Sequence, residues 1–142
     1  MTSDSPAFEQ WAASVPAHIT GDPIWRMSVF RLASYCLAVG WGDVLALSRY
    51  GPTRLIAPQL YKALGSIPAN IAEGYSRSSG RDRCRIYEYG LGSTRESTVW
   101  YGAAAPVLGR QIVEARQEML QDVVRRMLVV IPAERRRSIT RE

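Results

Sequence analysis

The sequence predicts an all-α protein, an antiparallel up-down four-helix bundle with a short N-terminal extension. Apolar residues recur at spacings of three and four along four stretches of roughly twenty residues, the period of a helix that buries one face. The chain has no stretch with the period of two that is typical of a strand, and short turns separate the four stretches. The 142 residues suit one such domain.

The chain divides into three segments by composition. They are the N-terminal extension 1–21, the bundle 22–132 and the basic C-terminal tail 133–142. We expect the first helix of the bundle to begin at Asp22, an N-cap residue followed by Pro23 at the first helical position. Its apolar face is wider than one stripe, so this helix must be covered on two sides.

The extension contains the signals of a short helical turn. Ser5 and Pro6 can cap a turn that carries Phe8 and Trp11, and Pro16 would end it. These two aromatic side chains would pack either on the bundle or on a neighbouring subunit.

The second helix is expected from Pro58, because proline fits the first turn of a helix. Pro68 falls in its middle and removes the hydrogen bond to the carbonyl of Leu64, which predicts a kink and not an end. One face carries a ridge of small side chains that would allow close approach of another backbone, namely Gly65, Ala69 and Ala72.

The third helix should open at Ser79, since Asp82 three residues later completes a capping-box pattern. Gly90 and Gly92 lie inside it and each costs about 1 kcal/mol relative to alanine, which suggests a tight helix–helix contact. The helix should end between residues 103 and 106.

The fourth helix is expected from Arg110 to Val130, with Pro132 closing it and a frayed polar tail beyond. Aromatic residues of the bundle are interpreted as core and interface anchors and not as base-stacking platforms. They are Trp25, Trp41, Trp100 and Tyr101.

The residues offer little for catalysis or metal binding. Cys36 and Cys84 are interpreted as small buried hydrophobes, and with His18 as the single histidine they do not assemble a zinc site. Glu88 and Glu96 lie eight residues apart, but the ExxH motif of a di-iron bundle is missing. We therefore expect no enzyme activity and no cofactor.

The segments that direct a protein to a membrane or out of the cell are not recognisable either. The sequence has no run of eighteen apolar residues and no readable signal peptide at its start. These observations predict a cytoplasmic protein without a membrane partner.

The charge is positive and uneven. The net charge is +5, but the eighteen basic residues all follow residue 22, where only ten acids oppose them. Seventeen of the eighteen are arginine, whose planar fork of donors suits phosphate. A GC-rich genome would produce the same arginine excess, so composition alone leaves both explanations open.

The stretch from Ser66 to Gly74 reads SIPANIAEG, and Gly92 and Ser93 are followed by Glu96. Both strings resemble the motifs of the bacterial four-helix-bundle family encoded by intervening sequences of 23S ribosomal RNA, over roughly Trp25 to Met127. Gly65 and Thr94 depart from the family pattern. The signature residues are Ser66, Pro68, Asn70, Glu73, Gly74, Gly92, Ser93 and Glu96.

The resemblance implies a homo-oligomeric ring, typically a pentamer. A more distant similarity is to the accessory proteins of diversity-generating retroelements, basic pentameric bundles that bind a reverse transcriptase and nucleic acid. We interpret the signature as structural: Asn70 and Glu73 could reach backbone groups freed by Pro68, and Glu73 forms an i,i+4 pair with Arg77.

Two arginine clusters are the best functional candidates. We expect them at opposite ends of the bundle, as separate patches that a ring would repeat into belts of positive charge. Such belts would bind phosphate backbones of RNA or DNA without reading sequence. The candidates are Arg77, Arg81, Arg83 and Arg85 in the second loop, and Arg135, Arg136, Arg137 and Arg141 in the tail.

Two functions remain open. The first is a ring-shaped RNA-binding protein that uses these arginines. The second is an oligomeric scaffold that binds a partner protein, such as a reverse transcriptase, through the apolar first helix and the aromatic extension; in that case the arginines are an ordinary solvated loop and tail.

Overall fold

The computed structural model describes residues 5–141, with the side chains of residues 5–137. Every regular element in this part of the chain is helical, which confirms the predicted all-α class. The elements in chain order are α1 (Pro6–Ser14), α2 (Ala17–Thr20), the 3₁₀ turn η1 (Pro23–Arg26), α3 (Ser28–Ser48), the 3₁₀ turn η2 (Gly51–Thr53), α4 (Ile56–Tyr75), α5 (Gly80–Ala103), α6 (Ala105–Leu108) and α7 (Arg110–Arg141).

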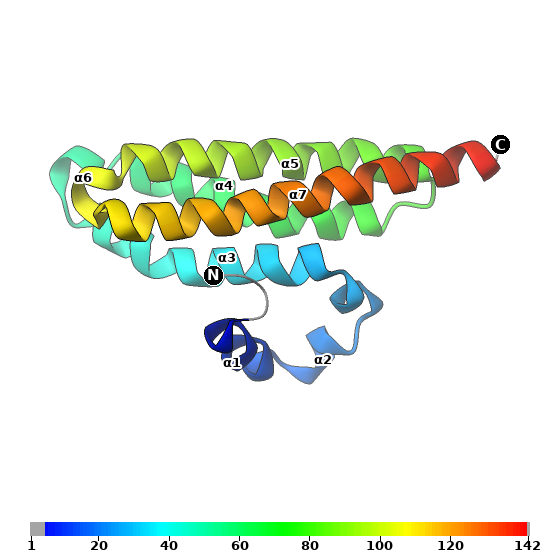
Figure 1. The fold of residues 1–142 in the computed structure, drawn as a ribbon, viewed down its shortest axis with the longest axis horizontal. Helices are drawn as coiled ribbons and strands as arrows, with labels where there is room; N and C mark the ends of the chain where they lie inside the picture. Colours follow the sequence, from blue (N-terminus) through cyan, green and yellow to red (C-terminus); the bar gives the residue numbers. More distant parts are fainter. Residues whose placement is uncertain (1–4, 142) are drawn as a thin grey trace.

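The long helices α3, α4, α5 and α7 lie side by side (Figure 1). Helix α4 packs against α3 and α5, and α7 packs against α5 and α3, so each long helix has two long neighbours. The apolar stripe of each helix turns to the shared interior. Its fully buried members include Leu32, Leu60, Leu64, Ile67, Ile71, Tyr87, Met119, Leu120 and Met127.

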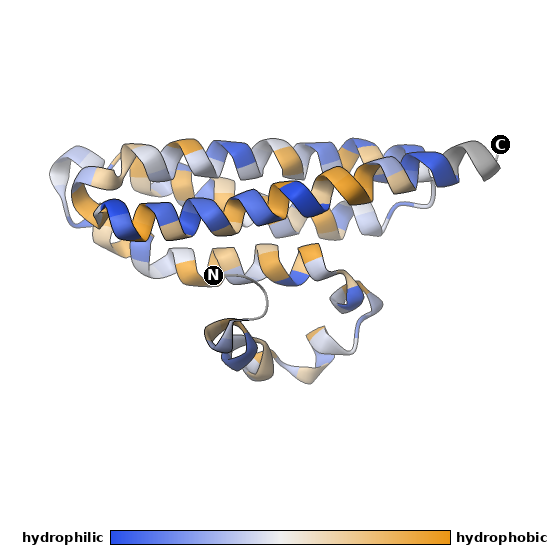
Figure 2. Ribbon diagram, viewed as in Figure 1, coloured by the Kyte–Doolittle hydropathy of each residue, from blue (hydrophilic) through white to orange (hydrophobic). Residues whose placement is uncertain are grey.

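Helix α3 is the most apolar of the four. Figure 2 shows it mainly in orange and pale tones, whereas much of the blue lies on the visible side of α7. By length and composition α3 could cross a membrane, and it is the one helix of residues 5–141 that could. This modifies the expectation that no segment is apolar enough. A helix that packs in the core of a soluble protein has the same properties, and 44% of the apolar stretch of α3 is buried in the bundle.

The cap at Asp22 forms, but it opens a different element from the one expected. Its Oδ1 accepts a hydrogen bond from the Ile24 amide at 3.0 Å and caps η1. The chain leaves helical geometry at Met27, and α3 begins at Ser28. The cap and proline therefore start a single 3₁₀ turn that leads into the long helix.

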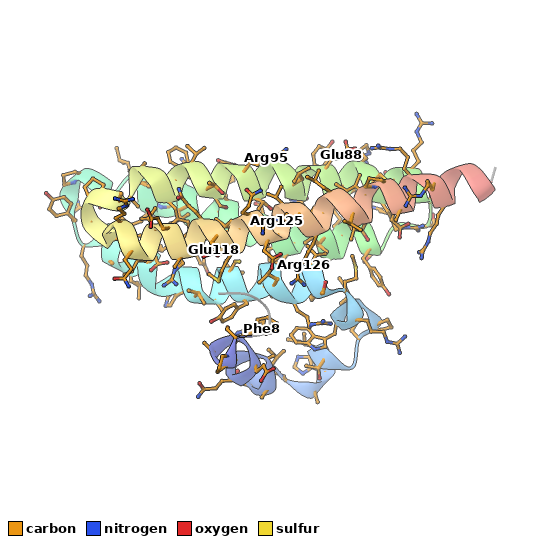
Figure 3. The ribbon with its side chains drawn as sticks, viewed as in Figure 1. Phe8, Glu88, Arg95, Glu118, Arg125 and Arg126 are labelled. Carbon is orange, nitrogen blue, oxygen red and sulfur yellow. The ribbon has the colours of Figure 1, made fainter. Side chains whose placement is uncertain are left out.

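The N-terminal extension packs on its own bundle. Ser5 caps α1 by accepting from the Phe8 amide at 3.2 Å, as the sequence predicts. The Phe8 ring is buried and meets the ring of Tyr35 edge-on, with centroids 5.3 Å apart. The centroid of the Trp11 ring lies 5.3 Å from that of Tyr35 and 6.0 Å from that of Trp25. Figure 3 shows Phe8 between α1 and α3.

The two prolines inside long helices behave alike. Helix α4 begins at Ile56, two residues before the expected start, and continues through Pro68 as predicted. The expectation that Pro132 ends the last helix is wrong, because α7 continues through it to Arg141. One lost backbone hydrogen bond is offset there by contacts beyond the proline, since Glu134 and Arg135 pair with α5.

The glycines of α5 do not mark the tight contact that was expected. A Cβ at Gly92 would meet no atom within 4 Å, and one at Gly90 would have ordinary contacts from 3.5 Å. Close approaches lie instead at Gly40, where a Cβ would collide with Leu64 Cδ1, and at Gly74, where a Cβ would come within 2.8 Å of the Tyr87 ring. Gly109 has φ of 85° and begins the turn into α7.

The capping of α5 follows the sequence. The Ser79 hydroxyl oxygen accepts from the Asp82 amide at 3.1 Å, and the helix ends at Ala103. Because α5 begins directly after the turn 76–79, Arg81, Arg83 and Arg85 lie on the first turns of this helix.

Candidate nucleic-acid interface

The two arginine clusters meet at one end of the molecule. Arg83 Nε lies 3.0 Å from Glu134 Oε2, and Arg135 Nη2 lies 2.5 Å from Glu88 Oε1, so the start of α5 contacts the end of α7. The expectation that the clusters lie at opposite ends is therefore wrong. The chain reaches this end after α4, leaves along α5 and returns along α7.

We call this region the arginine end. It comprises Arg77, Arg81, Arg83 and Arg85 with Arg135, Arg136 and Arg137. The side chain of Arg141, also expected in the tail cluster, lies outside the described residues. Four acids oppose the seven arginines, which leaves a surplus of three positive charges; they are Glu73, Asp82, Glu88 and Glu134.

Arg83 has a structural role at the arginine end, and its guanidinium is poorly accessible to a ligand. Its side chain is 12% exposed. Besides its ion pair with Glu134, its Nη1 donates to the carbonyl oxygens of Arg77 at 2.8 Å and Ser78 at 3.2 Å. A guanidinium that satisfies two loop carbonyls and a carboxylate fixes the 76–79 turn against α7.

Arg77, Arg81 and Arg85 present their charges to solvent. Arg77 pairs with Glu73 at 2.7 Å, which confirms the predicted i,i+4 pair, and lies 3.8 Å from Asp82. Arg85 pairs with Asp82 at 2.9 Å, and hydrogen bonds to Asp82 and then to Tyr89 raise its pKa. Arg81 is exposed and has no ion pair within the described part of the chain. An open hollow of about 490 Å³ is lined by Ser79, Arg81, Asp82 and Arg85.

The last turns of α7 add three exposed arginines to this end. Arg135 pairs with Glu88, and Arg137 lies 3.3 Å from Glu134 Oε1. Arg136 is exposed between them. Because α7 extends past Pro132, these side chains project from a regular helix and not from the frayed tail that the sequence predicts.

Tyr89 also belongs to the arginine end, and the sequence reasoning missed it. It is 53% exposed, and the guanidinium carbon of Arg85 lies 5.8 Å from its ring centroid. The available signal was the spacing of four between Arg81, Arg85 and Tyr89, which places all three on one side of a helix.

Two of the signature residues, Asn70 and Gly74, lie where α4 meets α5. Asn70 lies beside Gly90, since a Cβ on that glycine would be 3.5 Å from the Asn70 Cβ. Asn70 Nδ2 donates to the Ser66 carbonyl at 2.7 Å, not to the Leu64 carbonyl that Pro68 leaves unpaired. Glu73 pairs with Arg77, so neither residue takes the role expected next to the proline within this subunit.

The remaining signature positions have local roles. Pro68 and Gly74 are buried, and Ser66 Oγ donates to the Lys62 carbonyl at 2.8 Å. The Ser93 carbonyl accepts from Ser97 Oγ at 2.9 Å. Glu96 Oε1 accepts from Trp100 Nε1 at 3.2 Å, whereas Gly92 faces open space.

A buried polar network lies away from the arginine end. Asp43 is 6% exposed and accepts from Tyr101 OH at 2.7 Å and from Arg116 Nε at 2.8 Å. Burial first, and then the Asp43 charge, raises the pKa of Tyr101. The network links α3, α5 and α7, and every buried side-chain nitrogen and oxygen atom among the described residues has a hydrogen-bond partner, which is the pattern of a structural pair.

The thiols are buried and poorly reactive. Burial raises the pKa of Cys36 to about 12 and also raises that of Cys84, whose Sγ donates to the Ile131 carbonyl at 3.3 Å. Both thiols therefore stay protonated near neutral pH. No cluster of three metal-ligating side chains occurs among the described residues.

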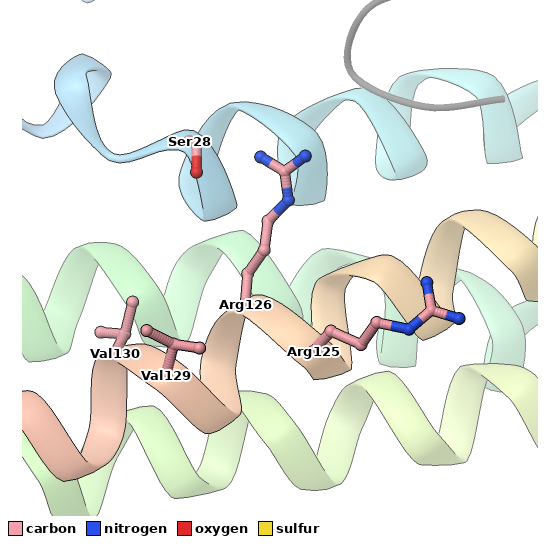
Figure 4. A pocket seen from close by; sticks show the side chains of 5 residues that line it. All are labelled: Ser28, Arg125, Arg126, Val129 and Val130. Carbon is pink, nitrogen blue, oxygen red and sulfur yellow. The ribbon is translucent and has the colours of Figure 1, made fainter.

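A second hollow of about 320 Å³ lies between the start of α3 and α7 and is lined by Ser28, Arg125, Arg126, Val129 and Val130 (Figure 4). Arg126 extends toward α3 and pairs with Asp122 at 3.1 Å. Arg125 is exposed and points along α7, away from Ser28. This hollow lies apart from the residues of the arginine end.

Comparison with models of known protein families found no match. Comparison with curated proteins found no significant similarity. The interface is therefore argued from its own geometry.

Proposed function

We propose that the chain is a non-catalytic nucleic-acid-binding protein whose ligand site is the arginine end. The observation that carries the proposal is the convergence of two arginine clusters, distant in sequence, on one end of the molecule. Arginine binds phosphate through charge-assisted, often bidentate hydrogen bonds, and clustered arginines release counterions from a nucleic acid when they bind it.

The proposed architecture is the antiparallel up-down four-helix bundle. Three contacts support it: Gly40 of α3 packs on Leu64 of α4, Gly74 of α4 packs on Tyr87 of α5, and Arg83 at the start of α5 pairs with Glu134 near the end of α7. Gly40 lies eight residues before the end of α3 and Leu64 lies eight residues after the start of α4, as expected for antiparallel neighbours.

The proposal includes a homo-oligomeric ring in the cytoplasm, a pentamer with RNA as its ligand, on the strength of the family resemblance. A cyclic assembly repeats the same surface around one axis. Because both clusters share one end, a ring that aligns the subunits would gather all the positive charge on a single face. A single face that carries both arginine clusters would bind a phosphate backbone more strongly than two separate faces that each carry one cluster.

The absence of enzyme activity is part of the proposal. The exposed charged groups of the arginine end are arginines and the acids that form ion pairs with them. General acid–base catalysis needs a group that titrates near the working pH. The buried, protonated thiols are not candidates for a nucleophile.

The proposal is tested by the binding of a labelled structured RNA at increasing salt. We expect Arg81→Ala/Arg85→Ala to weaken binding about tenfold or more at low salt and to reduce the slope of log affinity against log salt by about one for each lost phosphate contact. The charge-matched control is Arg49→Ala/Arg54→Ala, which removes two exposed arginines outside the arginine end and should leave affinity within about twofold. Wild-type protein that binds no RNA at low ionic strength would refute the proposal.

Asp82 competes with the ligand for two of these arginines. It pairs with Arg85 at 2.9 Å and lies 3.8 Å from Arg77. Asp82→Asn should therefore tighten RNA binding by about three- to tenfold at low salt, since it removes the acid that pairs with Arg85 and a charge that repels phosphate, while Arg77 keeps its pair with Glu73. The gain should disappear at high salt in the same titration. An unchanged or lower affinity would show that phosphate does not reach this hollow.

An oligomeric scaffold for a partner protein is the second candidate. It is favoured by exposed aromatic side chains on neighbouring helices: Trp41 is 51% exposed, Tyr61 is 42% exposed, and their ring centroids lie 5.3 Å apart. Phe8, which sequence reasoning assigned to this role, is buried against Tyr35 and is not available. Recovery of nucleic acid without any protein from the native host would exclude this candidate.

A further inference from the structure

Tyr89 stands out among the residues of the arginine end. A single exposed aromatic residue is common on protein surfaces and needs no explanation by itself. Tyr89 differs because its surroundings are cationic: Arg85 lies over its ring, and Arg81 and Arg85 line the adjacent hollow. An aromatic face set among arginines is the combination that binds unpaired nucleic acid.

The three side chains form a row along α5. Arg81, Arg85 and Tyr89 are separated by four residues each, so they project from one side of the helix at intervals of about 6 Å. Arg85 Nη1 donates to the Tyr89 hydroxyl at 3.2 Å, which orients the guanidinium across the ring. The row thus offers two arginines that can bind phosphate and, beside them, an aromatic ring on which a base can stack.

We propose that Tyr89 is a stacking platform for an unpaired base, and that the arginine end binds single-stranded nucleic acid in preference to duplex. The inference rests on the nucleic-acid binding proposed above. In a duplex the faces of the bases are covered by their neighbours, and the protein meets phosphates and groove edges. In a single strand each base has a free face that can stack on a tyrosine, whatever its identity.

The charge pattern agrees with this ligand. Within one subunit the surplus is three positive charges, so the ionic contacts of a strand with that subunit are few. A flexible strand can follow the row on α5 and turn its bases toward the ring. Stacking then supplies the part of the affinity that the small charge surplus does not.

The test compares a labelled single-stranded RNA of mixed sequence with the duplex that it forms with its complement, at equal length and low salt. We expect wild-type protein to bind the single strand about tenfold or more tightly than the duplex. Tyr89→Leu should weaken single-strand binding about tenfold and change duplex binding by less than about twofold. Tyr50→Leu is the matched control, because Tyr50 is also 53% exposed but lies at the start of η2; it should change neither.

Two further variants separate stacking from the positioning of Arg85. Tyr89→Phe keeps the ring and removes the hydroxyl that binds Arg85, so it should retain single-strand affinity within about twofold. Tyr89→Trp should match or exceed wild type. If Tyr89→Phe loses as much affinity as Tyr89→Leu, the hydroxyl matters and stacking is refuted.

The possible failures can be told apart. Equal binding of single strand and duplex, both lost with Arg81→Ala/Arg85→Ala and both unaffected by Tyr89→Leu, would overturn the stacking platform and leave the phosphate site in place. No binding of either RNA by the wild-type protein would overturn the proposed function and this inference together.

Discussion

Replacing Arg116 by alanine should destabilise the protein by about 3 kcal/mol or more, because it leaves a carboxylate in the core without its cation. Asp43 is 6% exposed, and the Arg116 side chain is 17% exposed. After the substitution the Tyr101 hydroxyl, at 2.7 Å, would remain as a neutral donor to the charge. The free energy of unfolding from chemical denaturation, followed by far-ultraviolet circular dichroism, measures the effect.

Two controls define this result. Arg110→Ala removes an ion pair of similar geometry, with Glu114 at 2.6 Å, but the Arg110 side chain is 88% exposed, so the expected loss is much smaller than that of Arg116→Ala. The double variant Asp43→Leu/Arg116→Met removes both charges and should recover part of the loss, because the buried Tyr101 hydroxyl loses its acceptor. If Arg116→Ala cost no more than Arg110→Ala, Asp43 would have to be solvated in the folded protein.

This network also shows where sequence reasoning stops. An aspartate within the apolar stretch that became α3 was visible in the sequence, but its partner lies 73 residues further on and looked like one arginine among many. Periodicity assigns a residue to a face of its helix. It does not identify which side chain on another helix meets it.

The helices themselves were largely predictable because their signals are local. Ser5 and Ser79 cap the helices they were expected to cap, and α4 passes through Pro68. Pro132 is also a proline within a helical stretch, but we expected it to end its helix, and that prediction was wrong. Contacts with α5 beyond the proline keep α7 helical, and such contacts cannot be read from the residues around Pro132.

The candidate site was predicted in its residues but not in its geometry. The arginine clusters are evident in the sequence, yet their meeting at one end depends on the connectivity of the helices. The sequence also treats Arg83 and Arg81 as equals, although Arg83 is 12% exposed and Arg81 faces solvent. Only packing separates an arginine that holds a loop from one that can receive a phosphate.

The signature glycines Gly74 and Gly92 should respond to alanine in opposite directions. At Gly74 the new Cβ would come within 2.8 Å of the Tyr87 ring and 3.2 Å of the Arg83 carbonyl oxygen. Tyr87 is 1% exposed and cannot move aside without disturbing the core. We expect Gly74→Ala to destabilise the protein by about 1–2 kcal/mol, the cost of overpacking reduced by the gain in helix propensity.

At Gly92 a Cβ would meet no atom within 4 Å, so only the helix propensity changes. Gly92→Ala should therefore stabilise the protein by about 0.5–1 kcal/mol in the same denaturation experiment. The contrast bears on the arginine end, because Gly74 lets α4 approach Tyr87 closely beside the loop that Arg83 fixes. Gly74→Ala should move this loop and so weaken RNA binding, whereas Gly92→Ala should bind RNA as the wild type does. If Gly92→Ala weakened RNA binding instead, the open face around Gly92 would belong to the ligand or to a neighbouring subunit.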